Sequence, residues 1–120
     1  MIFPISTKIE ENKQDYVFEA YGYRVNLTTF IYPVGNPVDF SVQVKCKYDE
    51  IMPYPIIRYN RALKQFEGVF NSFFSVKEDN AEEWIKSIKN ASAFIKEMNE
   101  TLNYYVENYE KLRDNYRKGK

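Results

Sequence analysis

Apolar and polar residues alternate through the first half of the chain, and this alternation predicts β-strands. The clearest case covers residues 38–48, in which every second residue is apolar and the residues between them are polar. The apolar positions are Val38, Phe40, Val42, Val44, Cys46 and Tyr48. A period of two with one apolar face is typical of a half-buried strand in an antiparallel sheet. Cys46 lies on that face, which favours a buried structural thiol over a nucleophile.

Three further strands are predicted before it. Residues 3–9 alternate weakly, and Pro4 indicates an edge strand. Residues 15–21 and 23–32 are rich in aromatic and β-branched residues and are expected to meet in a tight turn at Gly22. A single long strand with a bulge at that glycine is the alternative. The first half therefore predicts an antiparallel sheet of about four strands.

After Pro55 the period of the apolar residues changes. Steps of four and three predict a shorter amphipathic helix over residues 59–75, with Asn60 as its N-cap. Its apolar positions are Tyr59, Leu63, Phe66, Phe70 and Phe73. Gly68 costs about 1 kcal/mol inside a helix, so a hairpin through Glu67–Gly68 stays open as the alternative.

The same steps continue without interruption near the C-terminus and predict one long helix over residues 80–118. No Gly or Pro lies within it. At ~1.5 Å per residue such a helix is about 57 Å long, whereas a compact domain of this size is roughly 35 Å across. We therefore expect the helix to pack across the sheet with its first half and to extend beyond it with its second half. A break between Asn99 and Asn103 is the alternative.

An apolar stripe on the extending half would need a covering surface. This predicts a homodimer formed through the C-terminal helix, or contact with a protein target there. The residues assigned to this contact are Met98, Leu102, Tyr105, Tyr109, Leu112 and Tyr116. The alternative is that the stripe is ordinary core within one chain. The fold expected is α+β, a single domain over residues 1–120, mainly β over 1–58 and mainly α over 59–120.

Composition argues against most kinds of catalysis. The chain has no histidine and one cysteine, so the commonest general base and metal ligand is missing and a Cys-based zinc site is excluded. No nucleotide, phosphate or hydrolase motif is present. We therefore expect no enzymatic activity, no cofactor and no metal site.

Nucleic-acid binding is an alternative that charge does not favour. Seventeen basic residues balance seventeen acidic ones, whereas proteins that bind phosphate backbones are usually basic. A basic and aromatic sheet face could still hold a single strand. Its candidate residues are Tyr21, Tyr23, Arg24, Lys45 and Lys47.

Tyrosine-rich composition favours protein recognition, since tyrosine adds large contact area at low entropic cost. The chain has 11 tyrosines, and codon bias in an AT-rich genome accounts for part of that number. No secretory signal or membrane-spanning run is expected, which predicts a cytoplasmic protein. We expect a non-catalytic protein-protein interaction module, with a phage or mobile-element inhibitor of a host defence enzyme as one form. A toxin-neutralising immunity protein and a nucleotide-signal-binding protein are further alternatives.

Overall fold

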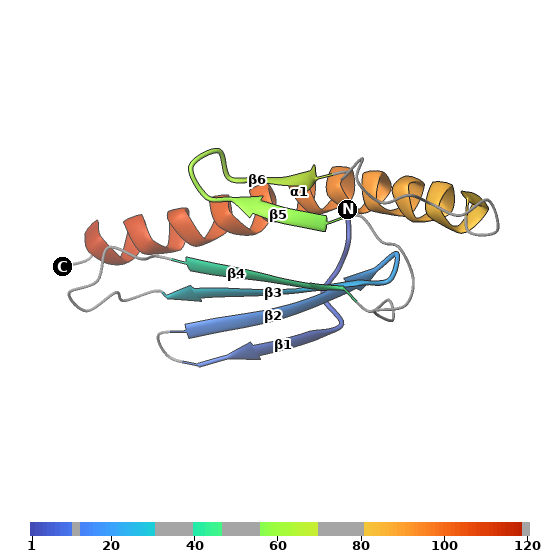
Figure 1. Cartoon of the computed structure of the whole chain (residues 1–120). Coiled ribbons are helices and arrows are strands. Elements are labelled where there is room, and N and C mark those ends of the chain that lie inside the picture. The colour runs from blue at the N-terminus through green and yellow to red at the C-terminus, as the bar shows by residue number, and fades with distance from the viewer. Residues whose placement is uncertain (11–12, 31–39, 47–55, 70–80, 119–120) are drawn as a thin grey trace.

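Six strands and one helix make up the computed structural model, which describes residues 1–10, 13–30, 40–46, 56–69 and 81–118 (Figure 1). The predicted α+β class is confirmed. The elements are β1 (Ser6–Ile9), β2 (Lys13–Ala20), β3 (Tyr23–Phe30), β4 (Phe40–Cys46), β5 (Ile56–Asn60), β6 (Gln65–Val69) and α1 (Ala81–Lys118).

The first four strands form the predicted antiparallel sheet, in the order β1-β2-β3-β4. β2 and β3 pair along their whole length, from Lys13 opposite Phe30 to Ala20 opposite Tyr23. The two residues between them, Tyr21 and Gly22, have positive φ angles of 54° and 84°. Two consecutive positive φ angles are typical of a type I′ turn, whose twist matches that of the flanking strands. The predicted turn at Gly22 is therefore correct, and the bulged single strand is not observed.

One face of this sheet is buried beneath α1. The alternation in β3 is complete, because Tyr23, Val25, Leu27 and Thr29 are buried and the residues between them are not. Val42 and Val44 of β4 pack against the same core, whereas Ser41, Gln43 and Lys45 are exposed. The prediction for residues 38–48 thus holds for the described side chains. The side chain of Cys46 lies outside them.

Residues 59–75 were predicted as a helix, and for the described part this is wrong. β5 and β6 form an antiparallel hairpin in which Tyr59 lies opposite Phe66. The turn spans residues 61–64, not Glu67–Gly68, and Lys64 adopts a φ of 53° in it. Asn60 does not cap a helix; its side-chain Oδ1 accepts a hydrogen bond from the Leu63 backbone N–H at 3.2 Å. This is a turn contact that asparagine makes readily.

The hairpin is stabilised by aromatic contacts between its two strands and with α1. The Tyr59 and Phe66 rings lie 5.3 Å apart, and Phe66 also meets Phe94 of α1 at 6.2 Å. Asn99 Oδ1 accepts a hydrogen bond from the Phe66 backbone N–H at 2.8 Å. Leu63, which a helix would place on the apolar stripe, is 60 % exposed in the turn. Phe70 and Phe73 lie outside the described residues.

The C-terminal helix is unbroken over 38 residues, as predicted. It runs along the length of a molecule with extents of 62 × 26 × 21 Å (Figure 1). Its packing differs from the prediction, however, because buried side chains extend from Ser87 to Tyr109 and so include much of the second half. Tyr109 donates a hydrogen bond from its hydroxyl to the Phe30 backbone carbonyl at the end of β3. The second half therefore packs on its own sheet as far as Tyr109, and Leu112 beyond it is exposed.

Candidate protein-binding surface

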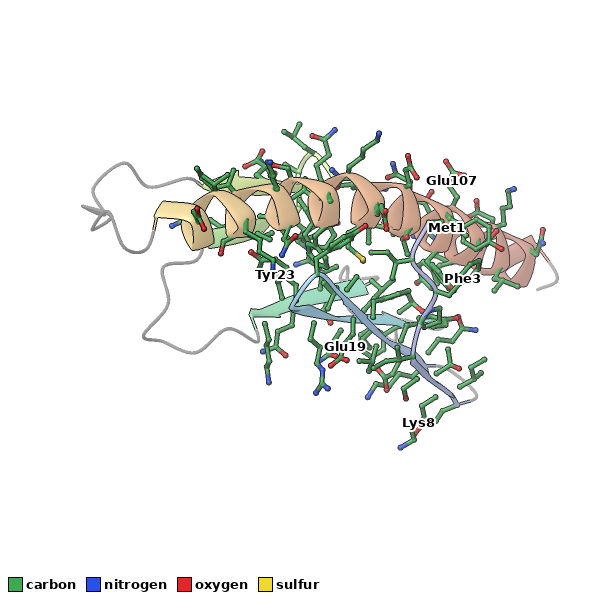
Figure 2. All side chains as sticks on the ribbon, turned by 90° about the vertical axis from the view of Figure 1, so that its right-hand side faces the viewer. Met1, Phe3, Lys8, Glu19, Tyr23 and Glu107 are labelled. Atoms are coloured by element: carbon green, nitrogen blue, oxygen red, sulfur yellow. The ribbon has the colours of Figure 1, made fainter. Side chains whose placement is uncertain are left out.

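The N-terminal segment before β1 is attached directly to the middle of α1. The Thr101 hydroxyl accepts a hydrogen bond from the Ile2 backbone N–H at 2.9 Å and lies 3.3 Å from the Ile2 carbonyl oxygen, to which it donates. Ile2 and Thr101 are both buried. From this point the chain crosses from the helix to the edge of the sheet, with Met1 and Phe3 at one end and Lys8 at the other (Figure 2).

Large apolar side chains remain exposed along this crossing. Phe3, Ile5 and Ile9 are 71 %, 59 % and 67 % exposed. Ile9 lies on the same side of β1 as Thr7, which is opposite Tyr16 of β2. Ile5 interrupts this alternation, because its backbone N–H, like that of the next residue, is directed toward β2 and donates to the Val17 carbonyl at 2.8 Å. The Thr7 side of the sheet carries the core, but α1 covers β2 and β3 and leaves β1 open. All four residues of β1 are exposed.

The helix contributes an aromatic wall to this region. Tyr105 of α1 packs against Tyr16 and Phe18 of β2, with ring centroids 4.8 Å and 5.4 Å apart. Tyr104 follows at 5.2 Å from Tyr105 and is 49 % exposed. We call the exposed group the N-terminal edge surface; it consists of Met1, Phe3, Ile5, Ile9 and Tyr104.

Burial changes the acidity of the two tyrosines behind this surface. Desolvation raises the pKa of the Tyr16 hydroxyl, and the neighbouring Tyr105 raises it further. Desolvation likewise raises the pKa of Tyr105, with Tyr104 as the second cause. The Tyr16 hydroxyl donates a hydrogen bond to Gln14 Oε1 at 2.9 Å. Both phenols therefore stay neutral at physiological pH and act as packing groups.

β1 is also an edge strand with backbone groups directed outward. The Glu10 N–H donates to the Lys13 carbonyl at 2.8 Å. Since backbone groups alternate in direction along an antiparallel strand, Ser6 and Lys8 direct theirs toward β2, whereas Thr7 and Ile9 direct theirs away from it. Within the described part of the chain no strand pairs with this outer edge. An edge of this kind can accept a further strand.

The residues predicted from the helix for self-association lie in two environments. Met98, Leu102 and Tyr109 are buried within the chain, at 1 %, 1 % and 2 % exposure, and belong to its own packing. Tyr105 is half-buried, as described above, and Leu112 is 47 % exposed near the end of the helix. The side chain of Tyr116 lies outside the described residues.

The residues predicted for a nucleic-acid face are divided between the two sides of the sheet. Tyr23 is 1 % exposed on the core side, where its ring packs 4.8 Å from that of Phe94. Arg24 and Lys45 are cross-strand neighbours on the open side, but Arg24 is paired with Glu19 at 2.6 Å.

The remaining two residues of that set are Tyr21 and Lys47. Tyr21 donates a hydrogen bond from its hydroxyl to Glu97 of α1 at 2.8 Å, and this bond is the main reason why its pKa is raised. Lys47 lies outside the described residues. Among the described members of the set, the structure therefore does not bring the tyrosines together with the basic residues on one face.

A concave region lies between the two sheets. It is an open cleft of about 480 Å³ between β4 and the β5–β6 hairpin. The described residues that line it are Ser41, Val42, Val44, Ile57, Arg58, Tyr59 and Arg61. Desolvation raises the pKa of Tyr59, and Arg61 partly opposes this effect. The Tyr59 hydroxyl oxygen is itself buried, so it is not available to a molecule in the cleft.

The described ranges of the chain hold neither a candidate metal site nor a membrane-spanning helix. In these ranges no three acidic or cysteine side chains converge in a group that could hold a metal ion. Nor does any helix there combine the length and apolar character needed to cross a bilayer.

Sequence reasoning identified the alternation of residues 3–9 but not the N-terminal edge surface. The signal was available, since the spacing of Phe3, Ile5 and Ile9 predicts one apolar side on a strand that Pro4 marks as an edge. What the sequence does not contain is the position of α1, which leaves that side uncovered. Searches against protein-family models, curated proteins and solved structures found no match to this chain.

Proposed function

We propose that this protein is a non-catalytic protein-protein interaction module that binds its partner through the N-terminal edge surface. The observation that carries this proposal is the exposure of Phe3, Ile5 and Ile9, each well over half exposed, in and just before an edge strand. Contiguous apolar patches are uncommon on monomeric soluble proteins and mark interaction sites.

The chemistry of the surface favours a protein over a polyanion. All five of its side chains are uncharged, and only the Tyr104 hydroxyl adds a polar side-chain group. Nucleic acids are bound chiefly through cations that neutralise phosphates, and such groups are not part of this surface. Aromatic and methionine side chains, in contrast, are enriched in protein interfaces. Binding of this kind could inhibit a host defence enzyme, which is the action that the size and composition of the chain suggest.

A photo-crosslinking experiment tests the proposal. A benzophenone amino acid replaces Phe3, the protein is produced in cells, and cross-linked products are identified by mass spectrometry. We expect one dominant protein product, which disappears in an Ile5→Asp/Ile9→Asp variant because two charges now lie in the interface. The product must then form a complex with the purified protein of defined stoichiometry.

The matched control is Leu63→Asp, which places a charge at another exposed apolar residue, in the β5–β6 turn. It should leave the cross-linked product unchanged. If the Ile5→Asp/Ile9→Asp variant, still folded by circular dichroism, gives the same products as the parent protein, the N-terminal edge surface is not the binding site.

A further inference from the structure

We infer that a second copy of this chain binds the N-terminal edge surface, by antiparallel pairing of β1 with β1 of the other copy. Two four-stranded sheets would then join into one continuous sheet of eight strands. The inference rests on the proposed function, because it names the partner of the same surface. It differs from the dimer predicted from the sequence, which used the C-terminal helix.

The backbone of β1 supplies the pairing groups. Thr7 and Ile9 direct their N–H and C=O groups away from β2, as the Glu10–Lys13 hydrogen bond establishes. The Ile5 N–H is already donated to the Val17 carbonyl at 2.8 Å, which leaves its own carbonyl as an acceptor. A copy related by a two-fold axis through Thr7 can therefore make two Thr7–Thr7 bonds and two bonds from Ile9 N–H to the Ile5 carbonyl of the other copy.

Side chains favour the same register. With Thr7 on the axis, the backbone of each Ile5 lies opposite that of Ile9 of the other copy, and both of these side chains are exposed and apolar. Lys8 then lies opposite Ser6. Moving the axis to Lys8 would place two lysines directly opposite each other, which is destabilising. Lys8 is further held by Glu10, whose carboxylate is 3.2 Å from its ammonium nitrogen.

The area and the charge are sufficient for a dimer. An aromatic side chain contributes roughly 150–250 Å² when fully buried. Phe3 and Tyr104 are 71 % and 49 % exposed, and Met1, Ile5 and Ile9 are 48–67 % exposed. If the second copy covered all of this exposed area, the total from both copies would reach the ~1000 Å² at which specific interfaces begin. The formal net charge of zero adds no overall repulsion between copies.

Measurement of mass against concentration tests the inference. Sedimentation equilibrium or light scattering should give twice the 14.4 kDa chain mass at high protein concentration. Thr7→Pro removes the central outward N–H without touching the bonds to β2, and it should raise the dissociation constant about tenfold or more. Ile9→Lys keeps the backbone intact and should weaken the dimer similarly. The Leu63→Lys control should leave it unchanged.

A cysteine series tests the register independently, in a Cys46→Ser background. Paired residues in this hydrogen-bonded position have Cα atoms about 5.5 Å apart, within disulfide range. Thr7→Cys should therefore form a cross-linked dimer on mild oxidation. Ser6→Cys and Lys8→Cys should not, because each reports an axis shifted by one residue. A faster cross-link at Ser6 or Lys8 than at Thr7 would overturn the proposed register.

The two proposals fail in different ways. A chain that stays at 14.4 kDa at the highest concentration tested, with a cross-linked target still dependent on Ile5 and Ile9, overturns self-association and supports the proposed function. If the Phe3 photo-crosslinker yields a product of two chains that Thr7→Pro abolishes, self-association is supported. A dimer of undiminished affinity in both Thr7→Pro and Ile9→Lys places the interface elsewhere and overturns the inference.

Discussion

β3 and the segment that contains β1, residues 3–9, both alternate in sequence, the second more weakly, but their environments are opposite. In β3 the alternation in sequence becomes an alternation in burial, and Tyr23, Val25 and Leu27 are each no more than 1 % exposed. In β1 all four residues are exposed, and the flanking Ile5 is 59 % exposed. Both strands belong to the same sheet, so the difference comes from the helix, which covers β3 and leaves β1 open.

The difference shows that an apolar face is a core only where another element covers it. Phe18, Val25 and Val44 lie side by side on β2, β3 and β4 and are covered by α1. The strand beyond β2, which is β1, is not covered by the helix. An alternating pattern thus predicts a strand and its two faces. It does not predict which face becomes an interface with another molecule.

The largest test of the comparison truncates one phenylalanine in each region. Phe94 is fully buried and packs against Tyr23 and Phe66, so Phe94→Ala should lower the free energy of unfolding by about 3–5 kcal/mol. Phe3, at 71 % exposure, buries little within the chain, and Phe3→Ala should change it by less than about 1 kcal/mol. Urea denaturation at a fixed low protein concentration measures both.

Equal losses for the two variants would contradict the division into a closed and an open region. The low concentration matters, because a dimer formed through the N-terminal edge surface would add concentration-dependent stability to the parent protein. Repeating the Phe3→Ala measurement at high concentration separates that contribution from folding of the single chain.

Local sequence pattern accounts for much of this fold. The four-stranded sheet, the turn at Gly22 and the uninterrupted helix all follow from periodicity and from the positions of Gly and Pro. These are local preferences, and each is reinforced by packing that agrees with it. The predicted position of the helix ends also agrees with Ala81–Lys118 to within about one residue.

The β5–β6 hairpin could not be predicted in the same way, because its pattern fits two structures. Tyr59 and Phe66 are spaced to share one side of a helix, but they also lie opposite each other in a hairpin with a four-residue turn. The contacts that decide between them come from α1, through Phe94 and Asn99. The candidate site was missed for a related reason, since exposure at β1 depends on where the distant helix lies.

A second prediction concerns the contact that joins the open region to the closed one. Thr101→Val keeps the shape of the side chain but removes both hydrogen bonds to the Ile2 backbone. The buried N–H and C=O of Ile2 lose their partner, so we expect a loss of about 1–3 kcal/mol in unfolding free energy. Amide hydrogen exchange at Ile2 should become faster by a larger factor than exchange within β3.

Thr101→Ser is the matched control, because it keeps the hydroxyl and loses only a methyl group. It should retain slow exchange at Ile2. Uniformly faster exchange across the whole chain in Thr101→Val would mean that the residue supports global stability instead of holding the N-terminal segment.

The boundary between the two regions should be sensitive to alkaline pH. Burial raises the pKa of Tyr105 above its usual value of 10.0, so the folded state holds this proton more tightly than the unfolded state. The stabilisation is fully present below about pH 10 and is lost as the pH rises through the raised pKa. Tyr105→Phe removes the titrating group, and its unfolding free energy should fall less between pH 9 and pH 11 than that of the parent protein.

Tyr104→Phe, which removes a hydroxyl from the more exposed neighbour, provides the comparison. A parallel decline of the parent protein and Tyr105→Phe over this pH range would show that the Tyr105 phenol is not desolvated. In that case the aromatic wall of the N-terminal edge surface would be wetter than the ring distances indicate.

The smallest effect is expected on the opposite flank of the helix, which the β5–β6 hairpin covers. Lys64 and Glu110 form an ion pair there, with Nζ and Oε1 2.8 Å apart. Both side chains are substantially exposed, at 46 % and 37 %, so water and salt screen the attraction. A double-mutant cycle with Lys64→Met and Glu110→Gln should give a coupling energy of about 0.2–1 kcal/mol, which decreases at high salt.

The comparison between the flanks depends on this value being small. Apolar packing is expected to hold the hairpin against α1, since Phe66 is 3 % exposed and contacts both Tyr59 and Phe94. Phe66→Ala should therefore lower the free energy of unfolding several times more than loss of the ion pair does. A coupling energy well above 1 kcal/mol that persists in high salt would instead mean that charge holds the hairpin against α1. The open β1 flank would then differ from the hairpin flank in two ways. It lacks apolar cover, and within the described residues its ion pairs do not reach the helix.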